Sequence, residues 1–156
     1  MKKELQDKIY ALYPELYREK DLPMSQTCMC WGLDCGEGWF NLLKTLTLGI
    51  KAVDSHYGTE TVAKQVKEKF GTLRFYFGVR HDDNEISTLV DDIISQMVDG
   101  AEVESGNTCE VCGEFGQVEN HHGWYMSRCS KCLKPEDKCD TLSAPDKKCE
   151  DCPDND

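Results

Sequence analysis

Four cysteines in two Cys-x-x-Cys pairs constrain the fold of this chain more than any other feature. The first pair, Cys109 and Cys112, is followed by Gly113, and sixteen residues separate it from the second pair, Cys129 and Cys132. Each pair makes a tight turn that points two thiols the same way, and the connecting residues are enough for one short hairpin. The spacing therefore predicts a closed tetrahedral zinc site on a zinc ribbon.

Two disulfide bonds are the alternative use of these four cysteines. Disulfides need an oxidising compartment, and the chain begins with Met-Lys-Lys-Glu and shows no apolar export segment. We therefore expect a cytoplasmic protein with reduced thiols that bind metal. Because four cysteines leave no position for water, the expected zinc is structural. Replacement of one cysteine ligand by His121 or His122 remains an alternative.

The other cysteines raise the question of a second metal site. They fall in two groups of three, namely Cys28, Cys30 and Cys35 near the N-terminus and Cys139, Cys149 and Cys152 near the C-terminus. Neither group has a fourth ligand close to it in sequence. We interpret the C-terminal group as a candidate second zinc knuckle, with three free thiols on a polar tail as the alternative.

Residues 27–40 combine three cysteines, three glycines and two tryptophans. Exposed tryptophans are good contact residues for a partner protein or a ring-bearing ligand. Two interpretations stay open here. Either Trp31 and Trp39 belong to a binding surface, or they anchor the core while the glycines turn the chain.

Hydrophobic periodicity predicts three amphipathic helices and one hairpin. Apolar residues at steps of three and four indicate helices over about residues 2–12, from Trp39 to Tyr57, and across the stripe from Ile86 to Val98. Gly58 is a natural C-terminal stop for the second helix. Residues 64–69 and 72–79 favour two strands around the turn Phe70-Gly71.

The predicted hairpin carries basic and aromatic side chains on its polar face. Lys69, Arg74 and Tyr76 are of the types that hold a phosphate or a nucleotide ring. A solvated outer strand face is the alternative.

The order of these segments resembles a family of small uncharacterised proteins encoded by phages, prophages and bacterial genomes. The resemblance covers about residues 28–132 and rests on the Cys/Gly/Trp-rich segment, the string Lys-Glu-Lys-Phe-Gly-Thr-Leu-Arg-Phe-Tyr at 67–76, and Cys-Glu-Val-Cys-Gly at 109–113. It implies an accessory protein of viral or mobile-element origin and carries no established activity.

Charge is distributed unevenly along the chain, whose formal net charge is −11. Residues 81–105 carry eight acidic and no basic side chains, and Asp91 and Asp92 lie outside the apolar stripe of the third helix. This acidic face is either a solubilising surface or a mimic of nucleic-acid phosphate. A chain this acidic disfavours general nucleic-acid binding, and no apolar run is long enough for a membrane span.

These observations predict an α+β fold in which amphipathic helices pack on a small antiparallel hairpin or sheet, with a C-terminal zinc ribbon. The expected domains are an α+β core at 1–105, the ribbon at 106–133 and an acidic, cysteine-containing tail at 134–156. The residues form no catalytic triad, nucleophile elbow, phosphate loop or zinc-protease string.

We therefore expect a non-enzymatic binding protein that inhibits a host defence protein. The alternatives are a protein that sequesters or cleaves a small nucleotide and a transcription-associated zinc ribbon.

Overall fold

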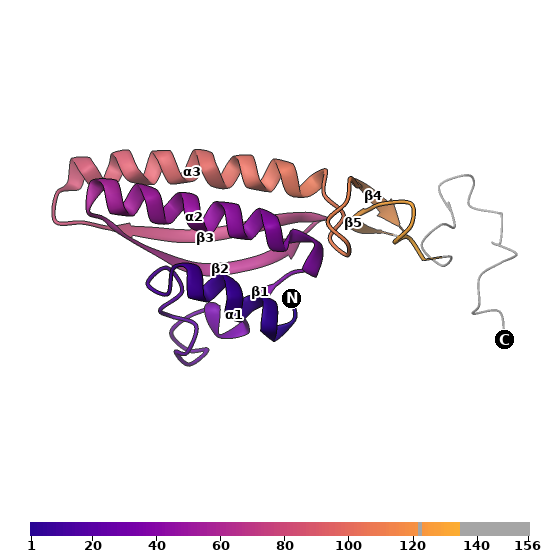
Figure 1. Cartoon of the computed structure of the whole chain (residues 1–156), viewed down its shortest axis with the longest axis horizontal. Helices are drawn as coiled ribbons and strands as arrows, with labels where there is room; N and C mark the ends of the chain where they lie inside the picture. The colour runs from indigo at the N-terminus through magenta and orange to yellow at the C-terminus, as the bar shows by residue number, and fades with distance from the viewer. Residues whose placement is uncertain (122, 135–156) are drawn as a thin grey trace, which may run out of the picture.

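The computed structural model describes residues 1–121 and 123–134 of the 156-residue chain. In these residues an α+β body leads into a two-stranded ribbon (Figure 1). The elements in chain order are α1 (Lys3–Leu12), η1 (Met29–Trp31), β1 (Leu33–Asp34), η2 (Glu37–Trp39), α2 (Phe40–Tyr57), β2 (Glu60–Lys69), β3 (Thr72–Arg80), α3 (Asn84–Gly106), β4 (Gln117–His121) and β5 (Trp124–Arg128). This arrangement confirms the predicted α+β class.

The three long helices form where the apolar periodicity predicts them, and local signals fix their ends. The α2 helix ends at Gly58, whose N–H donates to the Asp54 carbonyl at 2.8 Å and whose φ of 68° turns the following chain out of the helix. The α3 helix begins after Asp83, whose carboxylate accepts the N–H groups of Glu85 and Ile86. None of the helices in the described residues is both long and apolar enough to cross a membrane.

The main sheet has the order β1-β2-β3, with β1 parallel to β2 and β2 antiparallel to β3. The antiparallel hairpin was predicted, although β2 begins four residues earlier than expected and the short parallel strand β1 was not anticipated. One sheet face carries Leu33, Val66, Leu73 and Phe75, which join the helices in a single core. The alternating residues lie on the opposite, open face.

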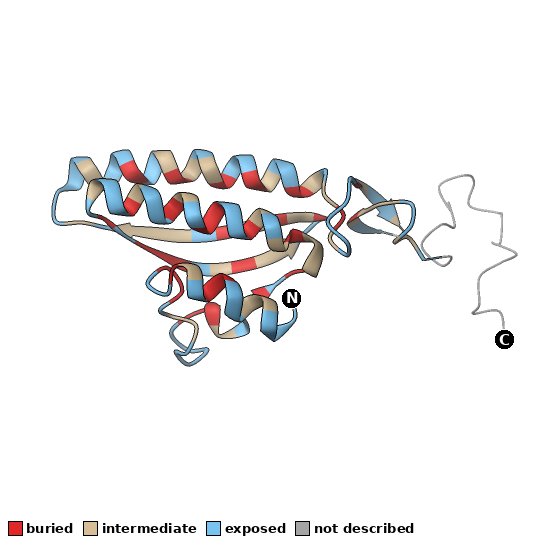
Figure 2. Ribbon diagram, in the orientation of Figure 1, coloured by how far each residue is buried: buried red, intermediate tan, exposed pale blue. Residues whose placement is uncertain are grey.

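The α3 helix also contacts the outer edge of β3, and Figure 2 shows buried residues recurring along the length of α3. The Ser105 hydroxyl accepts the N–H of Leu73 at 2.8 Å, and Glu102 accepts the N–H of Phe75 at 3.3 Å. These bonds satisfy donors that a free edge strand would offer to another chain.

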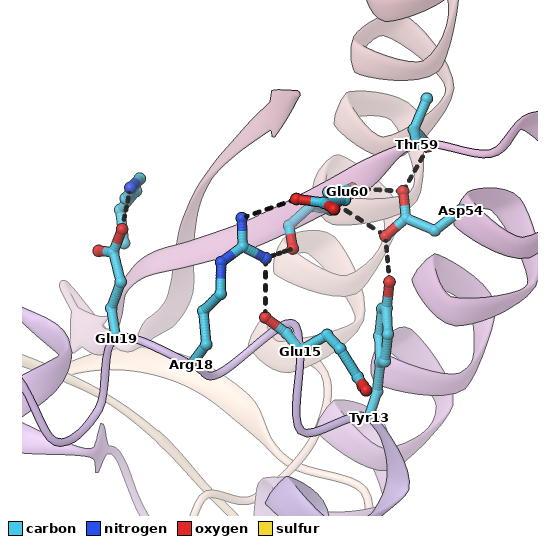
Figure 3. A network of polar contacts seen from close by, with 9 residues as sticks. Tyr13, Glu15, Arg18, Glu19, Asp54, Thr59 and Glu60 are labelled. Carbon is cyan, nitrogen blue, oxygen red and sulfur yellow. Dashed lines mark hydrogen bonds and ion pairs between the residues drawn. The ribbon is translucent and has the colours of Figure 1, made fainter. Parts of the chain in front are cut away.

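A buried carboxylate ties the N-terminal segment to the body (Figure 3). Asp54, near the end of α2, accepts hydrogen bonds from the Tyr13 hydroxyl at 2.8 Å and the Thr59 hydroxyl at 2.5 Å. It also accepts the backbone N–H of Thr61 at 3.0 Å and the Thr61 hydroxyl at 2.8 Å. Because the carboxylate is almost fully buried, this complete set of donors is what makes its burial tolerable.

Candidate metal centre

The structure brings together the four cysteines of the predicted zinc site. Cys109 and Cys112 follow α3, and Cys129 and Cys132 follow β5. Their Sγ atoms all lie within 4.8 Å of one another, and those of Cys112 and Cys129 are 3.6 Å apart. Tetrahedral Zn–S bonds of about 2.3 Å imply S–S separations of about 3.8 Å, whereas a disulfide needs about 2.05 Å. The spacing therefore suits four ligands around one ion.

Each cysteine pair lies on a tight turn closed by backbone hydrogen bonds. In the first turn the N–H of Gly113 donates to the Cys109 carbonyl at 2.8 Å, and Gly113 has a φ of 80°. In the second turn the N–H of Cys132 donates to the Cys129 carbonyl at 2.9 Å. The two turns together point the four thiols toward one another.

The electrostatics of the cluster favour a bound cation. Burial alone would raise the pKa of Cys109, but backbone N–H groups of Cys112, Cys129 and Val111 lower this pKa to about 6. The hydrogen bonds of Cys132 with the Cys112 and Cys129 thiols raise the pKa of Cys132 to about 12. The Cys109 thiolate thus forms readily, whereas the raised pKa of Cys132 disfavours its thiolate unless a cation binds beside it.

Four thiolates fill a tetrahedral coordination sphere, so the centre has no open position for water or substrate. No histidine or carboxylate joins the cluster within residues 1–121 and 123–134. The His121 ring lies at the end of β4, 3.5 Å from the Glu119 carboxylate, and His122 falls outside the described residues. The cluster is therefore a four-cysteine site that can bind a metal ion.

The first cysteine turn rests on the Cys/Gly/Trp-rich segment. The N–H of Gly38 donates to the Glu110 carbonyl at 2.8 Å, and the N–H of Gly36 donates to the Glu110 carboxylate at 2.7 Å. A Cβ atom would lie 2.1 Å from the Glu110 carbonyl oxygen if placed on Gly36, and 2.1 Å from the Cys109 carbonyl oxygen if placed on Gly38. These glycines are needed because two backbones come into contact.

A second contact joins the ribbon to the tip of the β2–β3 hairpin. Phe70 and Gly71 form the two-residue turn with φ values of 55° and 76°. A Cβ on Gly71 would lie 2.8 Å from a methyl group of Val118 in β4. The Phe70 and Tyr125 rings pack edge to face, with their centroids 6.3 Å apart. Sequence reasoning identified the turn at Phe70 but missed its contact with the ribbon.

The structure separates the two tryptophans that were considered together. Trp39 is fully buried, and its indole N–H donates to the Thr108 carbonyl at 2.9 Å, close to the first cysteine turn. The assignment of Trp39 to a ligand or partner surface is therefore wrong, because no ligand can reach it. Trp31 is 65% exposed and remains a candidate contact residue.

The N-terminal cysteines do not form a second metal centre in the described part of the chain. Cys35 is buried in the core, where the loss of solvent raises the pKa of its thiol to about 12. Cys28 is exposed, and the Cys30 thiol donates to the Thr27 carbonyl at 3.2 Å. The only cluster of ligating side chains found among the described residues is the one at Cys109. The predicted second knuckle at Cys139, Cys149 and Cys152 lies outside the described residues.

The predicted basic residues share the open face of the main sheet. Lys67 pairs with Arg74 in the β2–β3 register, and Lys69 and Tyr76 follow on the same face. The Lys67 ammonium lies 5.8 Å above the Tyr76 ring, and the Lys69 ammonium lies 5.2 Å above the Phe70 ring. Arg74 is only partly available, since its guanidinium is 3.2 Å from the Glu102 carboxylate.

The predicted acidic residues lie on α3. Asp91 and Asp92 are exposed, and the buried stripe of the same helix is formed by Val90, Ile94 and Val98.

Comparison of the chain with protein-family models, curated proteins and solved structures finds no match. The class of protein is therefore defined by its own structure. It is an α+β protein with a four-cysteine, metal-ligating cluster at the base of a two-stranded ribbon.

Proposed function

We propose that the chain is a non-enzymatic zinc-ribbon protein that acts by binding another protein. The observation that carries this proposal is the closed set of four cysteine ligands, because such a set holds zinc as a structural ion and offers no site for substrate. An ion in this position fixes the two ends of the ribbon segment relative to each other. The ribbon can then present its surface to a partner in one conformation.

Large apolar side chains are exposed at the ribbon and at the hairpin tip that touches it. The most exposed is Trp124 at 75%, and the others are Phe70, Val111, Phe115 and Tyr125. Aromatic side chains of this kind dominate the binding energy of protein interfaces. Their concentration at one end of the molecule makes the ribbon end the favoured contact surface.

The proposed partner is a host protein in the cytoplasm of a bacterial cell. The resemblance to small phage and prophage proteins supports this choice, and it makes inhibition of a host defence protein the favoured outcome of binding. Such an inhibitor occupies the surface that its target uses and needs no catalytic residue. The acidic residues Asp91 and Asp92 offer a second contact if the target normally binds nucleic acid.

Affinity capture from a bacterial lysate, with bound proteins identified by mass spectrometry, tests the proposal. The wild-type chain is compared with Trp124→Ala and with Trp31→Ala, which removes an equally large exposed side chain from the body. We expect a protein that the wild type and Trp31→Ala retain and Trp124→Ala loses. Equal capture of the same protein by all three chains would show that the partner does not bind at the ribbon end. Elemental analysis should find about one zinc ion per chain.

A second candidate function is the binding of a small nucleotide on the open sheet face. The observation that favours it is the placement of Lys67, Lys69 and Tyr76 on one face of a strongly acidic chain. Calorimetric titration with nucleotides tests this binding. Lys69→Ala is a better test than a substitution of Arg74, because Arg74 also forms an ion pair with Glu102 within the fold. Loss of binding in Lys69→Ala with no loss after charge reversal of Asp92 would favour a nucleotide ligand over a protein partner.

Two simple assays address the remaining functions. Turnover of a nucleotide at a low ratio of protein to substrate would indicate an enzyme, because stoichiometric binding does not produce it. A salt-sensitive gel shift with DNA would indicate a transcription-associated zinc ribbon.

A further inference from the structure

The open face of the main sheet gathers positive charge beside the hairpin tip. Lys67 and Arg74 lie directly opposite each other in the β2–β3 register, and Lys69 follows Lys67 on the same face. Like charges directly opposite each other destabilise a pair of strands, so a neighbouring anion would stabilise this one. The chain around this face is acidic by contrast, since residues 1–134 carry 15 basic and 21 acidic side chains.

Two carboxylates neutralise part of this positive charge. Glu102 of α3 forms an ion pair with Arg74 at 3.2 Å, and Asp34 of β1 lies beside Lys67 in the sheet register. Asp34 is exposed, and it forms no ion pair within the part of the chain that the structure describes. Even if both carboxylates are counted, one of the three positive charges on this end of the face has no counterpart.

The ammonium groups of Lys67 and Lys69 are available to a further anion. Among residues 1–121 and 123–134, no carboxylate forms an ion pair with either of them. Glu68 lies between them in the sequence but is paired with the buried Leu73, which belongs to the opposite face. The two lysines therefore form an unpaired cationic site on one strand.

We infer that the C-terminal tail, residues 135–156, lies on this face of its own chain. The tail carries eight acidic and three basic side chains, so its formal net charge of −5 is opposite in sign to that of the face. Other lysines without an ion pair in the described residues, such as Lys8 of α1 and Lys44 of α2, lie on separate helices and offer one charge each. The adjacent lysines of the sheet face therefore attract the tail more strongly than these single charges do.

The tail begins close enough to the sheet to reach all of this face. The ribbon that precedes it contacts the hairpin tip, where the Tyr125 ring packs against the Phe70 ring (Figure 1). The 22 residues after Lys134 can extend over about 70 Å, whereas the nine residues of β3 span about 30 Å.

Weak ion pairs are sufficient for this contact because the tail is tethered. A short flexible tether gives an attached segment an effective concentration in the millimolar range, so a dissociation constant of about 1 mM already fills the face for half of the time. Exposed ion pairs are individually weak, but a few of them together supply such an affinity. A nucleotide or another anionic ligand would have to displace the tail from this face.

Carbodiimide cross-linking of the full, zinc-loaded chain tests the inference, because this reagent joins a lysine amine directly to a carboxylate in contact with it. Mass spectrometry of the digested monomer then identifies the linked residues. We expect links from Lys67 and Lys69 to carboxylates of residues 135–156, about 10-fold or more above those from Lys44. Salt at about 1 M, where the Debye length is about 3 Å, should abolish them.

A charge-reversal variant separates a specific contact from chance encounters. Lys69→Glu should reduce the links at Lys67 by about 5-fold or more, whereas Lys44→Glu should leave them unchanged. Links at Lys67 and Lys69 no more frequent than those at Lys44, or links at Lys67 that Lys69→Glu does not reduce, would overturn the inference. So would links found only between labelled and unlabelled chains in an isotopic mixture, because the tail would then lie on a second copy.

Discussion

The glycine at position 38 offers the sharpest test of how the ribbon is attached to the body. Gly38→Ala adds one methyl group at a point where the Cβ would lie 2.1 Å from the Cys109 carbonyl oxygen and 2.6 Å from the Gly113 nitrogen. Both neighbours are backbone atoms of the first cysteine turn, so no side-chain rotation can make room. The turn must move away from residues 36–39 as a unit.

The magnitude follows from the contacts that this movement breaks. Overpacking against rigid atoms costs about 1–3 kcal/mol. The displaced turn also loses the hydrogen bond from Gly38 N–H to the Glu110 carbonyl and weakens that from the Trp39 indole to the Thr108 carbonyl, each worth about 1 kcal/mol. We therefore expect Gly38→Ala to reduce the free energy of unfolding by about 2–4 kcal/mol.

Urea unfolding followed by tryptophan fluorescence measures this loss, and competition with a zinc chelator measures the accompanying fall in metal affinity. Gly78→Ala is the matched control, because the nearest atom to its Cβ would be the Lys64 side chain at an ordinary 3.8 Å. The control should unfold within about 0.5 kcal/mol of the wild type. If Gly38→Ala matched the control in stability and zinc affinity, the close approach of the two backbones would be refuted.

Three further predictions concern individual side chains. Cys129→Ser should lower the zinc content from about one ion per chain, as measured by elemental analysis, because it removes one of four thiolate ligands. Asp54→Ala should lower the free energy of unfolding, measured in urea, by about 3–5 kcal/mol, because the hydroxyl groups of Tyr13, Thr59 and Thr61 lose their acceptor. In alkylation followed by mass spectrometry, exposed Cys28 should react about 100-fold or more faster than Cys35, whose pKa burial raises to about 12. Equal alkylation rates would contradict the core position of Cys35.

The elements that the sequence predicts correctly are those set by local periodicity. The apolar stripe of α2, the stop at Gly58 and the Phe70-Gly71 turn depend on residues within a few positions of one another, and the structure confirms them. The four-cysteine cluster was predictable for the same reason, because the spacing within each pair determines its turn. Long-range packing then only had to bring the two turns together.

The features that the sequence does not reveal depend on contacts between distant segments. Gly36 and Gly38 are separated from Glu110 by more than seventy residues. Nothing near them in the sequence therefore indicates that their backbone contacts the first cysteine turn. The same contact decides which tryptophan is buried, because Trp39 lies beneath that turn and Trp31 does not. The pairing of Asp54 with Tyr13 is equally remote in sequence.

The composition of the ribbon indicates why a four-cysteine cluster and a contact with the body occur together. Within residues 107–134, leaving out 122, the buried residues are Cys109, Gly116 and Ser127, while Phe115 and Trp124 are largely exposed. A segment with so little apolar burial cannot stabilise its own fold. A metal ion held by the four cysteines would supply folding free energy, and the contact at Gly36 and Gly38 orients the ribbon on the body. The aromatic side chains of the ribbon are therefore not needed for its own core and stay exposed.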